Sequence, residues 1–144
     1  MSEFINTIDV LGDNAVCDAI IDGTLSELCD NVITYLHGGV LRYCANLTYV
    51  NLPCLLSMEG QAFEGCKVLN RLVLSSETMC ILQNTSAFND SSIKTGTGYI
   101  YVPRALVDSY KTATNWSTYA NQFRALEDYT VDGTVTGELD ESKI

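Results

Sequence analysis

The sequence predicts an α+β solenoid of about four stacked turns, with short strands on one face. The segment 47–74 repeats itself at a constant shift, which places Val50 on Leu72 and the preceding Cys44 on Cys66. The same shift continues toward the N-terminus, so that three copies of the pattern follow one another. Of the 144 residues, 47% are hydrophobic, which is enough apolar material for one core. A single turn cannot bury its own apolar side, and we therefore expect the turns to stack and share that core.

The spacing inside each copy predicts a short strand followed by a bulky apolar plug. In the second copy, Leu47, Val50 and Leu52 follow the spacing Leu-x-x-Leu-x-Leu, and the pair Ala62-Phe63 comes after a short connecting segment. Val50 and Leu52 alternate with polar neighbours as in a strand, and Pro53 ends it. Two amphipathic helices with the same spacing are the alternative, which Pro53 disfavours. A repeat of roughly 20 to 29 residues with this spacing is typical of a leucine-rich repeat.

These segments resemble a known family of repeats. The sequences of 47–53, LTYVNLP, and 62–69, AFEGCKVL, are similar to the BspA-type leucine-rich repeat, L-x-x-I-x-L-P-x-x-L-x-x-I-x-x-x-A-F-x-x-C-x-x-L. The start of the chain and the segment from Gly96 onward resemble small repeat proteins of phages and prophages from Gram-positive gut bacteria. The chain departs from the pattern at Val40-Leu41, where Ala-Phe is usual, and at Ser91, where Cys is expected. The resemblance implies a capped solenoid and a surface- or tail-associated binding role.

The order of the patterns predicts one capped domain and a tail. The expected boundaries are one domain over 1–126, made of an N-terminal helical cap (1–23), repeats (24–103) and a C-terminal cap of a helix and aromatic residues (104–126), followed by an acidic tail (127–144). Asp13 is a good N-cap for a short helix over 14–21. We expect Trp116 to plug the open C-terminal end, although it is also a candidate ligand platform.

The tail carries the signal of a β-hairpin. Asp132-Gly133 stands between the β-prone triplets 129–131 and 134–136, a pattern typical of a type I′ turn. An isolated hairpin is marginal in water, so it needs a docking surface. That surface belongs either to this domain or to another chain, and oligomerisation through 127–144 is therefore one possibility.

The net charge of −10 is unevenly distributed along the chain. Residues 1–41 carry a net charge of −7, residues 42–126 carry +2, and residues 127–144 carry −5. Because a basic face is missing, we expect no direct nucleic-acid binding, although competition for a basic partner stays open. No apolar run long enough to span a membrane is present and no Lys or Arg precedes Arg42, so we expect neither membrane insertion nor a signal peptide. The expected location is a phage virion or the cytoplasm of the bacterial host.

The sequence offers little for catalysis, metals or cofactors. The six cysteines form no C-x-x-C pair, and Cys44 and Cys66 occupy equivalent repeat positions, which favours stacking inside the core over disulfides or zinc. His37 is the single histidine, and no G-x-S-x-G motif accompanies it. We therefore expect no enzyme activity, no metal and no cofactor, while paired carboxylates that meet only in space stay open.

The strands predict a binding face. If the repeat leucines and their equivalents point inward, their neighbours point outward on one sheet. The candidate site is this exposed row: Tyr49, Asn51, Arg71, Val73, Tyr99 and Tyr101. Tyr and Arg anchor many interfaces, although Tyr also simply suits exposed strands. Replacing Tyr49 and Tyr101 together by Ser is then expected to abolish binding and to leave the melting temperature nearly unchanged.

The favoured function is non-catalytic binding of a protein or a surface glycan, in a tail- or virion-associated recognition protein. An intracellular acidic inhibitor of a host defence or nucleic-acid-binding protein is the first alternative, and its affinity is expected to fall steeply with salt. A structural subunit that assembles through the tail hairpin is the second.

Overall fold

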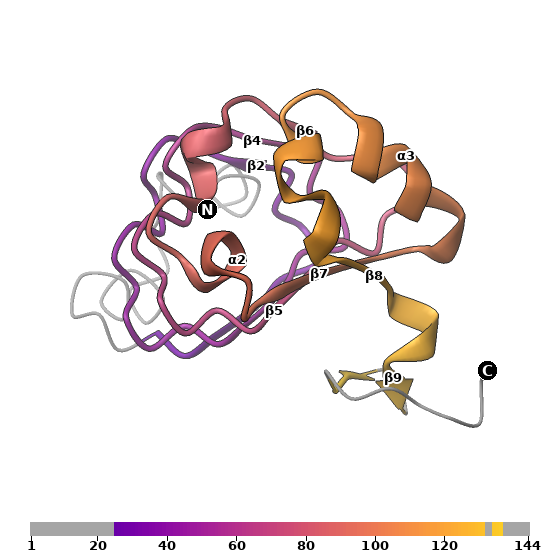
Figure 1. Cartoon of the computed structure of the whole chain (residues 1–144). Helices are drawn as coiled ribbons and strands as arrows, with labels where there is room; N and C mark the ends of the chain where they lie inside the picture. Colours follow the sequence, from indigo (N-terminus) through magenta and orange to yellow (C-terminus); the bar gives the residue numbers. More distant parts are fainter. Residues whose placement is uncertain (1–24, 132–133, 137–144) are drawn as a thin grey trace.

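The computed structural model describes residues 25–131 and 134–136 (Figure 1). Two parallel sheets run along opposite sides of this part of the chain. In Figure 1, β2, β4 and β6 lie at the top, β5, β7 and β8 lie below, and α3 lies toward one end. The predicted N-terminal cap (1–23), its helix over 14–21 and the turn residues Asp132-Gly133 lie outside the described residues.

The larger sheet has five parallel strands in the order β1-β3-β5-β7-β8. Its strands are β1 (Glu27–Cys29), β3 (Tyr49–Asn51), β5 (Arg71–Val73), β7 (Tyr99–Val102) and β8 (Phe123–Ala125). Glu27 pairs with Tyr49 and Tyr49 with Arg71, which confirms the predicted repeat shift. Arg71 then pairs with Tyr99, so the step from β5 to β7 is longer than the two steps before it.

The longer step before β7 has two contributions. The backbone nitrogen of Phe63 donates to the carbonyl oxygen of Ala87 at 2.7 Å, which places the pair Ala62-Phe63 beside the pair Ala87-Phe88, 25 positions further along the chain instead of 22. Two short helical segments then follow: the 3-10 helix η2 (Thr85–Phe88) and the helix α2 (Ser92–Thr95). Ser91, which replaces the expected Cys, caps α2 by accepting from the nitrogen of Lys94 and donates to the Phe88 carbonyl at 2.6 Å.

The smaller sheet was not predicted. Its strands are β2 (Tyr35–Leu36), β4 (Ser57–Met58) and β6 (Ile81–Leu82), and they run parallel in the order β2-β4-β6. Leu36, Met58 and Leu82 are buried at equivalent positions, while the residue before each of them points away from the core. Each of the first three described turns therefore contributes one strand to each sheet, whereas β7 and β8 belong to the larger sheet alone.

The core lies between the two sheets. The inward row Leu28, Val50, Leu72 and Ile100 is buried, as predicted. Phe63 is also buried and stacks on Phe88 with a centroid distance of 5.7 Å and an interplanar angle of 2°.

Two repeat cysteines are part of this core. Cys44 and Cys66 are both buried and free, which confirms their predicted place inside the stack. The thiol of Cys66 donates to the carbonyl oxygen of Leu41 at 3.1 Å, and the pKa of this thiol is raised by its hydrogen bond to Cys44 and by burial. Cys29 and Cys54 are exposed, so not every cysteine of the chain belongs to the core.

The C-terminal cap closes the stack with aromatic side chains. It comprises η3 (Arg104–Leu106), α3 (Val107–Thr112), η4 (Trp116–Gln122) and β8, and after it come η5 (Leu126–Asp128), β9 (Thr130–Val131) and β10 (Thr134–Val135). Trp116 is buried, which confirms the prediction that it plugs this end. The α-helix of the cap covers Val107–Thr112 alone, and Phe123 begins a strand that was not predicted and that extends the larger sheet.

The strand pairings follow the predicted repeat, whereas the assignment to BspA-type leucine-rich repeats stays a prediction.

None of the helices in the described ranges is long and apolar enough to cross a membrane.

Candidate binding surfaces

The predicted site residues lie together on the outer face of the larger sheet, but three of them are buried and the other three are only partly exposed. Tyr49, Val73 and Tyr101 expose only 6%, 2% and 1% of their surface, so the prediction of an exposed row is wrong for them. They are covered because β9 and β10 form the predicted hairpin and dock on this sheet, with Val135 buried against the same apolar cluster. In Figure 1, β9 lies below β7 and β8, on the side away from the smaller sheet.

Two arginines hold the aromatic side chains of this face in place. Arg71 donates from Nη1 to the carbonyl oxygen of Val135 at 2.7 Å, and its guanidinium lies 4.3 Å from the centre of the Tyr49 ring. Arg124 lies in the same way 4.4 Å from the centre of the Tyr99 ring. The positive charges over these rings form cation–π contacts, which stabilise the face in its covered state.

Tyr101 is the most enclosed of the predicted site residues. Its ring meets Tyr129 edge to face at a centroid distance of 5.3 Å. Burial, and next the neighbouring Tyr129, raise the pKa of the Tyr101 hydroxyl to about 12. Beside it, a hollow of about 310 Å³ is lined by residues in or just before β5 and β7 and by Thr136 of the hairpin.

Asn51 lies at the other end of this face. It is partly exposed, but its side-chain oxygen is buried and has no hydrogen-bond partner in the structure. A hollow of about 410 Å³, lined by Asn51, Pro53 and the residues 29–31, opens beside it.

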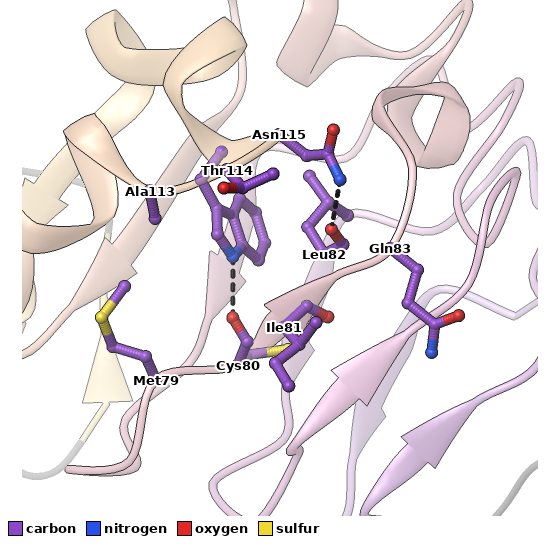
Figure 2. A pocket seen from close by; sticks show the side chains of 9 residues that line it. Met79, Cys80, Ile81, Leu82, Gln83, Ala113, Thr114 and Asn115 are labelled. Carbon is purple, nitrogen blue, oxygen red and sulfur yellow. Dashed lines mark hydrogen bonds between the residues drawn. The ribbon is translucent and has the colours of Figure 1, made fainter.

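A third hollow lies at the seam between the repeats and the C-terminal cap (Figure 2). Its volume is about 420 Å³. It is lined by Met79, Cys80, Ile81, Leu82, Gln83, Ala113, Thr114, Asn115 and Trp116. The strand β6 therefore forms one wall, and the segment between α3 and η4 forms the other.

The cap covers the open edge of β6 with hydrogen-bonding side chains. Trp116 donates from Nε1 to the carbonyl oxygen of Cys80, and Asn115 donates from Nδ2 to that of Leu82, both at 2.7 Å (Figure 2). The hydroxyl oxygen of Tyr110 accepts from the backbone nitrogen of Cys80 at 2.7 Å. These side chains take the place of a next strand, so that the edge does not offer these groups to another chain.

Two residues of this seam, Asn115 and Cys80, have properties that follow from their position in it. Asn115 has a φ of 66°, a conformation that Asn tolerates better than most residues, and this backbone directs its amide to Leu82. Burial raises the pKa of the Cys80 thiol to about 12, so this thiol stays protonated and is a poor nucleophile at neutral pH.

Next to the seam, the outer face of the smaller sheet carries a hydrogen-bonded network. Glu59 accepts from the hydroxyl of Tyr35 and, at 2.9 Å, from the nitrogen of Gly38. Gln83 donates from Nε2 to the Tyr35 hydroxyl at 3.1 Å and to Ser57 Oγ at 2.8 Å. The bond from Tyr35, and next that from Gly38, lower the pKa of the Glu59 carboxyl below its ordinary value. Glu59 therefore stays ionised at neutral pH.

The network and the seam hollow form one continuous surface. Gln83 takes part in the network and also lines the hollow, and Ile81, which is 62% exposed, lies beside it in β6. We call this the Ile81 surface and define it by Tyr35, Ser57, Glu59, Met79, Ile81 and Gln83. It has an aliphatic centre and a polar margin.

Sequence reasoning missed this surface for a simple reason. Tyr35, Ser57 and Ile81 each precede a buried repeat residue, so an outward direction follows from strand alternation. However, strands as short as these do not show a period of two in the sequence. In the described part of the chain, no three His, Cys, Asp or Glu residues lie together as metal ligands.

Comparisons of the chain with family models, with curated proteins and with solved structures found no match.

Proposed function

We propose that this chain is a non-catalytic protein of the leucine-rich-repeat type that binds a protein partner through the Ile81 surface. The observation that carries the proposal is the position of Ile81. This large aliphatic side chain is 62% exposed at the edge of an apolar hollow, and ordered polar side chains adjoin it. An apolar centre within a polar margin is how protein interfaces are built.

The polar margin supports binding because it is already ordered. Tyr35, Gln83 and Glu59 hold one another in place through hydrogen bonds within this chain. Side chains that are fixed before association lose less conformational entropy when a partner docks. The surface therefore favours a partner that fits its existing shape.

The partner follows from the charge and the shape of the surface. The hollow suits one aliphatic or aromatic side chain of the partner, which would pack against Met79 and Ile81. Glu59 is the acidic group of the surface, and a Lys or Arg at the edge of the partner's interface complements it.

A protein partner suits the surface better than a glycan. Sugars stack on exposed aromatic rings, whereas the large apolar side chain most exposed here is aliphatic. Tyr43 is an exposed aromatic residue, but it lies in the turn before β3, outside the Ile81 surface. The similarity of the chain's ends to small phage and prophage repeat proteins supports a setting in a phage particle or an infected cell.

The test compares three immobilised proteins: the unchanged chain, Ile81→Asp and Val68→Asp. Val68 is another exposed aliphatic residue, in the turn before β5, and provides the matched control. Extracts of the bacterial host are passed over each protein, and retained proteins are quantified by mass spectrometry. A candidate partner is then purified, and its affinity for each variant is measured by calorimetry.

We expect Ile81→Asp to weaken the purified complex by about 30-fold or more, which corresponds to about 2 kcal/mol at a central interface residue. Val68→Asp is expected to change the affinity by less than about 2-fold. Thermal melting of both variants checks that the fold is intact. Equal affinities for Ile81→Asp and the unchanged chain, or binding only to purified host glycan, would overturn the proposal.

A further inference from the structure

The tail hairpin, which we define by its described residues 129–131 and 134–136, covers a face that is itself built to hold an extended segment. Val135 is 3% exposed and packs in one apolar cluster with Tyr49, Val73 and Tyr101. The carbonyl oxygen of the same residue accepts the hydrogen bond from Arg71. One residue of the hairpin thus occupies a side-chain subsite and a backbone subsite at once.

A second contact between the hairpin and the sheet is made by an aromatic pair. Tyr129 meets Tyr101 edge to face. The two strands of the hairpin are only two residues long each, Thr130–Val131 and Thr134–Val135. A two-stranded hairpin as short as this one is marginally stable by itself, so it opens more readily than the core of the domain.

The base of the hairpin is held separately from its tip. Arg104 forms an ion pair with Asp128, and its backbone nitrogen donates to Glu127 Oε1 at 2.9 Å. Thr130 Oγ1 donates to the Leu126 carbonyl oxygen at 2.6 Å. These contacts anchor the start of the hairpin to the cap. Lifting Val135 from the sheet therefore leaves β8 and the cap in place.

We propose that the tail hairpin is a displaceable latch over a strand-binding face. When the latch opens, the face binds an acidic, extended segment of a partner protein. That segment places a β-branched aliphatic side chain among Tyr49, Val73 and Tyr101 and presents its backbone carbonyl to Arg71. This inference does not depend on the Ile81 surface, which lies on the other sheet.

The acidic character of the segment follows from charge. Arg71 and Arg124 both lie on this face, each over a tyrosine ring. The tail that supplies the hairpin, residues 127–144, has a net charge of −5, and its described acidic residues, Glu127 and Asp128, contact Arg104. Acidic groups beside the aliphatic side chain of a partner segment would complement Arg71 and Arg124 on the face.

The test uses full chains and a fluorescein-labelled synthetic peptide with the sequence of residues 126–144 as the probe. Val135→Thr keeps the shape of the side chain and adds a hydroxyl group, which weakens the latch with little risk to folding. Its amide hydrogen exchange and its circular dichroism are measured first. Faster exchange in 129–136 with an unchanged melting profile shows that the latch opens while the domain stays folded.

Peptide affinity then decides the proposal. We expect Val135→Thr to bind the peptide about 10-fold more tightly than the unchanged chain, because its internal competitor is weaker. The double variant Val135→Thr/Arg71→Gln is expected to bind the peptide about 10-fold more weakly than Val135→Thr alone. The matched control adds Arg42→Gln to Val135→Thr, which removes a partly exposed arginine outside this face. This change is expected to leave the peptide affinity as it is in Val135→Thr. A probe with Asp in place of the valine that corresponds to Val135 is expected not to bind.

Three results would overturn the inference. Unaltered peptide affinity in Val135→Thr despite faster exchange means that the hairpin does not compete for the face. Binding that survives Arg71→Gln, or that the Asp-substituted probe retains, places the peptide elsewhere. A dimer in light scattering that dissociates on Val135→Thr means that the occupant is the tail of a second copy and not a different partner.

Discussion

Arg71 in β5 donates a hydrogen bond of 2.7 Å to the carbonyl oxygen of Val135, which lies 64 positions further along the chain. This bond joins the middle of the larger sheet to the tail hairpin. It explains why the tyrosine row is buried: the outer face of the sheet belongs to a second apolar cluster, formed together with the tail. The described part of the tail hairpin is thus packed on the domain rather than separate from it.

Replacing Tyr101 by Ser is expected to destabilise the protein. The ring is 1% exposed, and removing a buried aromatic side chain costs about 3 to 5 kcal/mol. This reverses the sequence-based expectation that serine at Tyr49 and Tyr101 leaves melting unchanged. Urea unfolding measures the effect. Tyr43→Ser is the control, because Tyr43 is 59% exposed and its loss is expected to cost no more than about 0.5 kcal/mol. Equal costs for the two variants would show that the hairpin does not cover Tyr101 in solution.

Replacing Trp116 by Phe tests how the cap closes the edge of β6. The variant keeps an aromatic ring in the core but removes the Nε1 donor, which leaves the buried Cys80 carbonyl without this partner. We expect a loss of about 1 to 3 kcal/mol in the free energy of unfolding, the usual cost of an unpaired buried polar group. The exchange rate of the β6 amides is expected to rise at the same time. A variant as stable as the unchanged chain would contradict the edge-capping role.

Gly98 marks a close approach of two backbone segments. A Cβ added there would lie 2.1 Å from the carbonyl oxygen of Leu69, which cannot move without the repeat. We expect Gly98→Ala to lower the free energy of unfolding by about 2 to 4 kcal/mol. Gly96→Ala is the comparison, because that glycine has a φ of 101° but no atom within 4 Å of its added Cβ. At Gly96 the backbone conformation alone is therefore expected to lower the free energy of unfolding of the alanine variant by about 1 to 2 kcal/mol. Chemical denaturation of both variants distinguishes the two effects, and a smaller cost at Gly98 would contradict the close packing.

High pH is expected to weaken the fold in a defined window. Burial raises the pKa of both Tyr101 and Tyr110 from 10.0 to about 12, so the folded protein keeps two protons that the unfolded chain releases above pH 10. The stabilisation from these two tyrosines is therefore complete below pH 10 and is lost as the pH rises toward 12, while the contribution of the buried Cys80 thiol, whose pKa is raised from 9.0 to about 12, begins to fall above pH 9. At about 1.4 kcal/mol for each pKa unit, the loss is on the order of 2 to 5 kcal/mol.

Urea unfolding at several pH values, with tyrosinate absorbance in the near ultraviolet, checks the alkaline window. Tyr101→Phe serves as the control, because it removes one of the two titrating groups and should reduce the slope of stability against pH. A slope that is the same in the variant would show that Tyr101 does not titrate late.

The sequence by itself determined the parts of the structure that are repeated. The constant shift between copies predicted the pairing of Val50 with Leu72 and the burial of Cys44 and Cys66, because stacked turns place equivalent residues side by side. The hairpin around 132–133 was also predicted, since turn residues act locally.

Tertiary structure alone decided which faces are open. Strand alternation puts Tyr101 and Ile81 outside the core in the same way, yet Tyr101 is covered and Ile81 is exposed. The difference arises because the hairpin docks on one sheet through a contact between Arg71 and Val135, and no local pattern records a contact across 64 positions. A repeat pattern predicts on which side of its own strand a side chain lies. Whether another segment of the chain then covers that side chain depends on the packing of the whole fold.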